Sequence, residues 1–317
     1  MTRSPESLAL ALLTNRVVDV GVKPFTAREF FRTFASLHDL DGILELSPDG
    51  IATKFLVAPD AAQRIVELLA ASRAFAFELE RLEESGVHLL TQLDDDFPDR
   101  LRTVLGDQCP AALLIAGPVD WLSMPSVGIV GSRSISDSDV EVARRIAGVD
   151  VEAGFGVTSG LAKGIDQTAM AAGLDFQGRV CGFPSEGVNI VARRSDVRAA
   201  VHDDALALAS PFGPNAPFSV GNAMARNKLI YGACDVTVVV RSDKDKGGTW
   251  AGATEALERG YGRVAVWMGA DAGPGNAALV ARGATPITDL DDCSWLNPAK
   301  TAEPVPVLWP FETPRLF

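Results

Sequence analysis

Two glycine-rich turns lie close together in the sequence, and each carries small hydroxyl side chains and a cation. The first is Gly131-Ser132-Arg133, and the second is the octapeptide SGLAKGID at 159–166. Glycine lets the backbone approach a ligand closely, and free backbone N–H groups at a helix start favour an anion. Arg133 and Lys163 would add positive charge. These residue types predict a phosphate-binding site, while the alternative is a pair of tight turns without a ligand.

The flanking residues indicate how these turns are held. Val127–Val130 and Val157–Thr158 are short, mostly β-branched runs, which are typical of buried parallel strands. Ser136 and Asp137 are candidate N-caps for a helix between them, because an apolar periodicity follows and glycines close it. Parallel strands bring their carboxyl ends to one edge of a sheet. We therefore expect both turns to lie at the same edge.

The two turns together resemble the signature of a known family. The segments at 131–133 and 159–166 are similar to the GSR turn and the SGxAxGID loop in the Rossmann-like core of the DprA/Smf (DNA-processing protein A) family. The second motif matches at every fixed position. The resemblance covers roughly residues 86–290 and is strongest at these two turns.

Two further segments extend the resemblance. The second half of the family's Phe-Pro-x-Arg-Asn-Arg-x-Ile motif is matched, with Lys for the second Arg, by Arg226, Asn227, Lys228 and Ile230. The Phe-Pro pair is replaced by Ala223-Met224. The turn that ends in Gly247-Gly248-Thr249 resembles the family's Ser-Gly-Ser/Thr turn.

The pattern of the whole chain predicts an α/β protein. Short β-branched runs alternate with amphipathic segments from about residue 110 to 290, which predicts a Rossmann-like, doubly wound, mostly parallel sheet with helices on both faces. The earlier residues predict a helical domain, in which a capping box at Thr26–Glu29 starts a helix that ends near Leu37. In the family, a sterile-alpha-motif-like module occupies this position.

We divide the chain into three parts. A small N-terminal helical domain covers residues 1–86, and a Rossmann-like core covers residues 87–290. Residues 291–317 form a Pro-rich tail, which is too short for the C-terminal winged-helix domain that many family members carry.

Composition argues against several classes of protein. The 317 residues contain no apolar run long enough to span a membrane, and the four cysteines lie far apart without a CxxC pair. We therefore expect a cytoplasmic protein without a metal site or a disulfide framework. A net charge of −12 argues against a globally basic nucleic-acid binder. Neither GxGxxG nor GxxxxGK[ST] is present, which disfavours dinucleotide oxidoreductases and P-loop NTPases.

The resemblance implies binding of single-stranded DNA. Members of the family protect single strands and help to load the RecA recombinase during transformation and recombination. A homodimer through the Rossmann-like core is implied in the same way, and no cofactor or catalytic residue is expected. The predicted DNA-binding or phosphate-binding residues are Gly131, Ser132, Arg133, Ser159, Gly160, Lys163, Gly164, Asp166, Arg226, Asn227, Lys228, Gly247, Gly248 and Thr249.

A small nucleotide is the alternative ligand. The wider superfamily includes the cytokinin-activating phosphoribohydrolases, which cleave a nucleotide N-glycosidic bond with an Arg and a Glu near a glycine-rich turn. Here Glu255 follows the 247–249 turn, although an i, i+4 pair with Arg259 on a helix surface also explains this residue. A nucleotide sensor without turnover stays open as well. The acidic balance of the chain suits a small nucleotide better than a long DNA strand.

Overall fold

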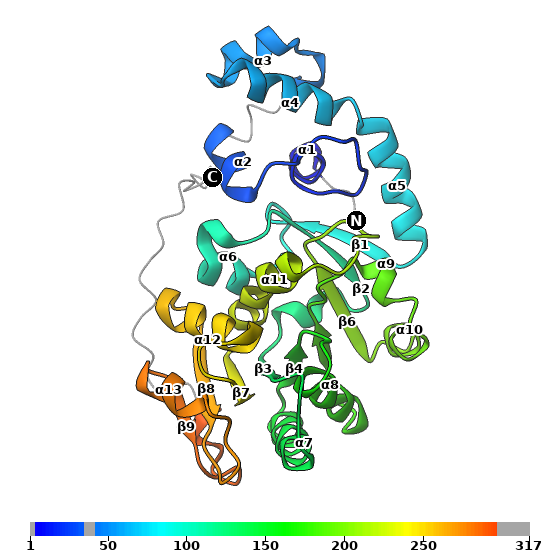
Figure 1. Ribbon diagram of the computed structural model, residues 1–317. Helices are drawn as coiled ribbons and strands as arrows, with labels where there is room; N and C mark the ends of the chain where they lie inside the picture. Colours follow the sequence, from blue (N-terminus) through cyan, green and yellow to red (C-terminus); the bar gives the residue numbers. More distant parts are fainter. Residues whose placement is uncertain (1–3, 35–41, 297–317) are drawn as a thin grey trace, which may run out of the picture.

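The computed structural model describes residues 4–34 and 42–296 as a nine-stranded sheet covered by helices, with further helices at one end (Figure 1). The predicted α/β class with a mostly parallel sheet is confirmed. In the part of the chain that the structure describes, no helix is long and apolar enough to cross a bilayer. Residues 297–317, most of the predicted Pro-rich tail, lie outside the described residues, as does Leu37.

The sheet has the strand order β1-β2-β6-β5-β4-β3-β7-β8-β9. Neighbouring strands from β6 to β9 along this order are parallel, whereas β1 and β2 are antiparallel to their neighbours. The strands are β1 (Val87–Thr91), β2 (Ala112–Ala116), β3 (Ser126–Gly131), β4 (Gly156–Ser159), β5 (Val180–Gly182), β6 (Leu206–Ser210), β7 (Val236–Arg241), β8 (Arg263–Trp267) and β9 (Thr285–Ile287).

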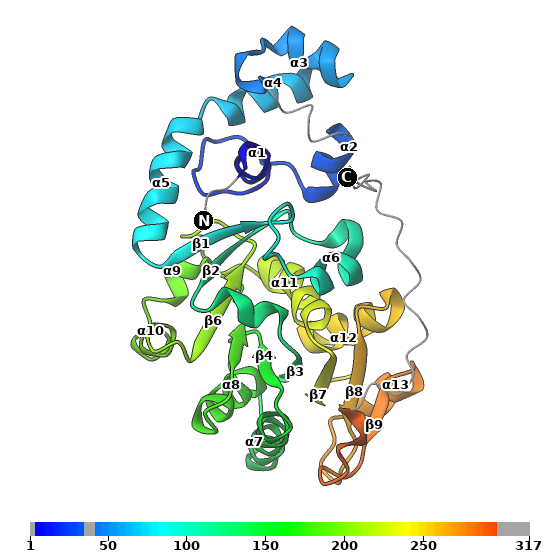
Figure 2. The ribbon, with the colours of Figure 1, turned by 180° about the vertical axis from the view of Figure 1, so that it is seen from behind.

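Helices cover both faces of the sheet (Figure 2). One face carries α7 (Asp137–Glu152) and α8 (Ile165–Asp175), which pack on each other and on β3 and β4. The other face carries α6 (Asp99–Leu105), α11 (Val220–Ala233), α12 (Gly247–Arg259) and α13 (Asn276–Ala281). Beside β6 lie α9 (Val188–Val191) and α10 (Ser195–His202).

Alternation along the central strands explains these two layers. In β3, Val127 and Ile129 face the core under α7 and α8, whereas Val130 faces the core under α11 and α12. In β7, Val238 and Val239 divide in the same way. Successive side chains of a strand point to opposite faces of the sheet, so a run of β-branched residues serves both cores at once.

The N-terminal residues form a group of helices above the β1 edge of the sheet (Figure 1). The group comprises α1 (Pro5–Thr14), α2 (Ala27–Thr33), α3 (Pro48–Phe55), α4 (Pro59–Leu69) and α5 (Ser72–Glu84). Its apolar side chains share one buried cluster with side chains of β1, β2 and β6. Our boundary at residue 86 stays a prediction.

The start of α2 was predictable from the sequence, but its end was not. The Thr26–Glu29 capping box is present, with the Thr26 N–H donating to the Glu29 carboxylate at 2.7 Å. The helix that we expected to end near Leu37 ends at Thr33, because Phe34 leaves helical geometry. Its buried ring packs against Phe30 and Phe55, each with a centroid separation of 4.8 Å.

Candidate functional site

The order of the strands reverses between β3 and β7. From β3 the chain continues through β4, β5 and β6 on one side, while β7, β8 and β9 lie on the other side. Loops that leave such a switch point diverge and open a crevice at the carboxyl ends of the strands. A cleft of about 410 Å³ lies here, lined by residues 130–134, Ala162, Asp166, Phe218, Val220, Ala223, Met224, Arg226, Asn227, Ile230, Tyr231, Ser242, Asp243 and residues 246–249.

The two glycine turns pack directly on each other at this edge. The Ile165 N–H donates to the Ser132 carbonyl oxygen at 3.2 Å. A Cβ on Gly131 would lie 2.5 Å from Cγ1 of Ile165. Gly164 has a φ of +86°, and a Cβ there would overlap the Ser132 carbonyl oxygen. Glycine is therefore required at both positions, and the turns share one edge as we expected.

A buried ion pair braces the second turn against α11. Arg226 and Asp166 are 4% and 5% exposed, and their nearest charged atoms, Nη1 and Oδ2, lie 3.9 Å apart. Nη2 of Arg226 also donates to the Gly160 carbonyl oxygen at 2.7 Å. Burial raises the pKa of Asp166, although Arg226 and backbone N–H groups that donate to the carboxylate oppose this. The pair therefore holds the edge of the cleft together.

Two buried polar atoms in residues that line the cleft lack a partner among the described residues. They are Nε of Arg226 and the hydroxyl oxygen of Tyr231. Buried polar groups are nearly always hydrogen-bonded, so these two unpaired atoms are an exception in the packing beneath the cleft.

Arg133 lies at the mouth of the cleft and is exposed. The pair with Asp137, which would be the simplest role of this cation, is not formed, and Arg133 makes no ion pair within residues 4–34 and 42–296. Its guanidinium carbon lies 5.9 Å from the ring centroid of Phe218. The predicted N-cap Ser136 is confirmed, with Asp139 completing a capping box at the start of α7. The helix start is thus satisfied without Arg133.

Three apolar side chains form an exposed rim on the cleft. Phe218, Val220 and Met224 are 50%, 72% and 40% exposed, and all three line the hollow. Sequence reasoning did not single out Phe218. Its signal was an aromatic residue in a Pro/Gly-rich loop just before the Arg226 motif.

The turn after β7 supplies backbone donors. Gly247, Gly248 and Thr249 begin α12, which has no side-chain cap, and all three line the cleft. The Thr249 hydroxyl donates to the Gly131 carbonyl oxygen at 2.8 Å, which ties this turn to the first one. Asn227 Nδ2 donates to the Gly248 carbonyl oxygen at 3.1 Å. An uncapped helix N-terminus leaves N–H groups free for an anion.

Several predicted residues do not line the cleft. Ser159 is fully buried and donates from its hydroxyl to the Ile129 carbonyl oxygen at 2.5 Å. The Gly160 carbonyl oxygen accepts from Arg226, and Gly164 packs against the backbone of residues 132 and 133. Lys163 is exposed and does not line the cleft. Lys228 donates from Nζ to Oε1 of Gln108 at 3.3 Å, and burial lowers its pKa.

Glu255 is not part of the cleft lining either. It pairs with Arg259 at i+4, with 3.5 Å between Oε1 and Nε. This matches the surface-pair interpretation of Glu255. The cleft therefore lacks the glutamate that the phosphoribohydrolase alternative assigned to it.

Comparison with known proteins identifies the family. Residues 88–296 match the family model described as DNA recombination-mediator protein A. The chain belongs to the DNA recombination-mediator protein A family. The cleft lies within the matched residues, so it is part of the family's common region.

Individual relatives agree with that assignment. The DNA processing protein DprA of Streptococcus pneumoniae is 32% identical over 171 residues, which are 53% of this chain and 58% of that protein's length. Its crystal structure superposes with a TM-score of 0.65 at 24% identity, covering 84% of this chain and 96% of that one. DprA from Helicobacter pylori, whose structure is described with a single-stranded DNA binding mode, superposes with a TM-score of 0.55 at 19% identity. The superposition covers 67% of this chain and 94% of that one. Both superpositions support the fold.

Proposed function

We propose that the cleft between β3 and β7 binds single-stranded DNA, and that the protein acts in DNA processing during transformation or recombination without catalysis of its own. The observation that carries this proposal is Arg133, which makes no ion pair with the described residues and lies beside the exposed ring of Phe218. A single strand offers both phosphates and unstacked bases, and a cation next to an aromatic ring suits this combination. Family membership and the single-stranded DNA binding described for the Helicobacter pylori protein support it.

The backbone around the cleft suits a phosphate. The uncapped start of α12 offers N–H groups, and the glycines at 247 and 248 leave room for a close approach. A phosphate at this position would be held by preorganised donors, while Arg133 would add charge from the mouth.

A small nucleotide stays the second candidate. The cleft volume of about 410 Å³ lies within the range of small-molecule sites. Because Glu255 lies outside the lining, this candidate is a sensor rather than an N-glycosidase.

A salt titration separates the two ligands. Fluorescence anisotropy with labelled oligo(dT) should give an affinity that falls steeply with salt, since each phosphate contact releases a counterion. The affinity for mononucleotides, which are screened by thermal shift, should depend much less on salt concentration. Absence of oligo(dT) binding at low salt would eliminate the first candidate.

Two further expectations rest on family resemblance, and a third, the cytoplasmic location, rests on the spacing of the cysteines. We propose that the chain forms a homodimer through its Rossmann-like core, that RecA is a partner, and that both act in the cytoplasm. Light scattering of the purified chain tests the first, and co-purification with RecA in the presence of oligo(dT) tests the second. A monomer at micromolar concentration would refute the dimer.

A further inference from the structure

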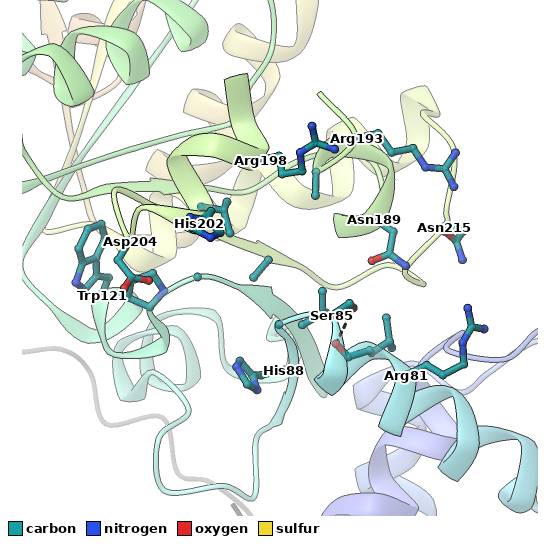
Figure 3. Close-up of a pocket in the computed structure, with 18 of the residues that line it drawn as sticks. Arg81, Ser85, His88, Trp121, Asn189, Arg193, Arg198, His202, Asp204 and Asn215 are labelled. Atoms are coloured by element: carbon teal, nitrogen blue, oxygen red, sulfur yellow. Dashed lines mark hydrogen bonds between the residues drawn. The ribbon is translucent and has the colours of Figure 1, made fainter. Parts of the chain in front are cut away.

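A second hollow lies apart from the cleft, where α5, β1 and the segment from α9 to α10 come together (Figure 3). Its volume is about 1160 Å³. One wall comes from the end of α5 and the start of β1, and the opposite wall comes from residues 189–204. We call it the α5–α10 groove, and the residues that matter below are Arg81, Trp121, Asn189, Arg193, Arg198 and Asn215.

The charges of this groove are unusual for so acidic a chain. Three arginines and two carboxylates line it, and one carboxylate, Glu78, is already paired with Arg81 at 2.7 Å. Arg193 and Arg198 are exposed and make no ion pair with any residue that the structure describes. The lining therefore holds two cations without an ion pair to the described residues and only one further carboxylate, Asp204, which favours an anionic ligand.

The uncharged residues of the groove narrow the kind of anion. The indole of Trp121 is half-buried, and the amides of Asn189 and Asn215 lie on the lining (Figure 3). An indole stacks on bases, and amides hydrogen-bond to base edges. Cations combined with these groups suit nucleic acid better than an acidic peptide, which has no bases to stack.

One loop separates the groove from the cleft. In the loop after β6, Asn215 lines the groove and Phe218 lines the cleft. Three residues span at most about 11 Å. The loop is fastened to the start of α9, because the Gly187 and Asn189 N–H groups donate to the carbonyl oxygens of Ala216 and Pro214 at 2.9 and 3.0 Å. The two hollows therefore keep a fixed relation across a short ridge.

We propose that the α5–α10 groove is a second contact surface for the same single strand of DNA. A strand that occupies the cleft crosses the ridge at residues 215–218 and continues into the groove. There Arg193 and Arg198 bind phosphates, and Trp121 with the two asparagines contacts bases. The inference rests on the proposed function of the cleft and extends the DNA path beyond it.

Oligonucleotide length tests the proposal. Fluorescence anisotropy is measured with oligo(dT) of about 5 and about 20 nucleotides. These lengths bracket the roughly 4–16 nucleotides that one single-strand-binding OB fold contacts. The parent should bind the longer oligonucleotide more tightly. The double variant Arg193→Ala/Arg198→Ala should keep the affinity for the short one and lose about 10-fold or more on the long one. For the double variant, the slope of the logarithm of the binding constant against the logarithm of the salt concentration should become shallower by about 0.7 for each lost phosphate contact.

A neighbouring arginine provides the control. Arg194 is exposed but paired with Asp196 at 3.0 Å, and it does not line the groove, so Arg194→Ala should behave like the parent. A double variant with parental affinity for the long oligonucleotide overturns the groove proposal and leaves the cleft intact. A parent that binds neither oligonucleotide refutes the cleft and the groove together. A poly-glutamate peptide that binds the parent but not the double variant, without any effect on DNA, assigns the groove to an acidic protein segment instead.

Discussion

Arg133 and Phe218 come from segments 85 positions apart in the sequence and face each other at the mouth of the cleft, 5.9 Å from guanidinium carbon to ring centroid. A cation–π contact at an exposed position contributes only about 0.5–1 kcal/mol. Both side chains stay largely accessible, so a ligand can replace or share this contact.

Replacing Arg133 should weaken binding without destabilising the fold. Arg133→Ala removes a charge-assisted hydrogen bond of roughly 1.5–3 kcal/mol, which is about 10- to 150-fold in affinity for oligo(dT). The melting temperature should stay near that of the parent, because the side chain is exposed and makes no ion pair with the described residues. Arg144→Ala is the control, since it removes a half-buried cation of α7 that lies outside the cleft and pairs with Asp175 at 2.9 Å. Parental affinity in the Arg133 variant would show that the centre of the site is misassigned.

Phe218 should act through its ring. Phe218→Ala should reduce oligo(dT) affinity by about 1–3 kcal/mol, the contribution of one stacked base, whereas Phe218→Tyr should retain it. Anisotropy titrations at fixed salt measure the difference. Equal losses in the two variants would mean that the loop conformation, and not stacking, is what matters.

Lys228 should be dispensable for binding even though it belongs to a family-like motif. Its ammonium contacts Gln108 outside the cleft, so Lys228→Met should leave the affinity for oligo(dT) within about twofold. The Met side chain keeps most of the apolar volume of the half-buried stem. A tenfold loss of affinity would contradict the placement of the DNA on the β3/β7 side of α11.

Two glycines with similar positive φ angles should respond differently to alanine. Gly164 and Gly247 have φ values of +86° and +79°, but only at Gly164 would a Cβ meet backbone, 2.8 Å from the Arg133 Cα. Gly247→Ala should cost about 1–2 kcal/mol of unfolding free energy from conformational strain alone. Gly164→Ala should cost clearly more, which denaturant unfolding can measure. Equal costs would mean that the two turns move apart easily.

Asp150 predicts a pH-dependent change in stability. Its fully buried carboxylate lies near the C-terminus of α7 with no hydrogen-bond partner among the described residues, and burial raises its pKa well above the ordinary value. A raised pKa in the folded state means that stability is fully present below the unfolded pKa of about 3.9 and is lost as pH rises towards the folded pKa.

Asp150→Asn removes this titration. The variant should therefore have a higher free energy of unfolding than the parent at pH 7, and the difference should shrink as pH falls towards 4. Urea unfolding at several pH values measures it. A difference that does not change with pH would show that the carboxylate is solvated or paired in solution.

Much of the sheet could be predicted because its strands are short β-branched runs. Val127–Val130 and Val236–Val240 are apolar enough to identify a strand buried on both faces. β9 was missed, since Pro286 lies in its middle and the run is only three residues long. The strand exists because it lies at the sheet edge, where a residue without an N–H is tolerated.

The site was only partly predictable for a similar reason. Local motifs identified the turns at 131–133 and 247–249, since glycine chemistry is visible in the sequence. Arg226 and Lys228 were treated alike, yet two residues apart on a helix differ by about 200° in direction. Only packing of α11 on the sheet decides which of them faces the cleft. Phe218 depends on a long loop, whose course no periodicity reveals.

The apolar cluster that joins the first helices to the sheet has a consequence for how the molecule unfolds. Leu10 and Phe30 lie in the same buried cluster as Leu114 and Leu208, so residues before and after position 86 lose their packing together. Segments that share a core open as one cooperative unit, whatever boundary the sequence suggests. Hydrogen exchange should then give the same free energy of opening for amides of α1 and of β2. Thermal unfolding should show a single transition for both. The N-terminal helices and the β1 side of the sheet therefore belong to one folding unit.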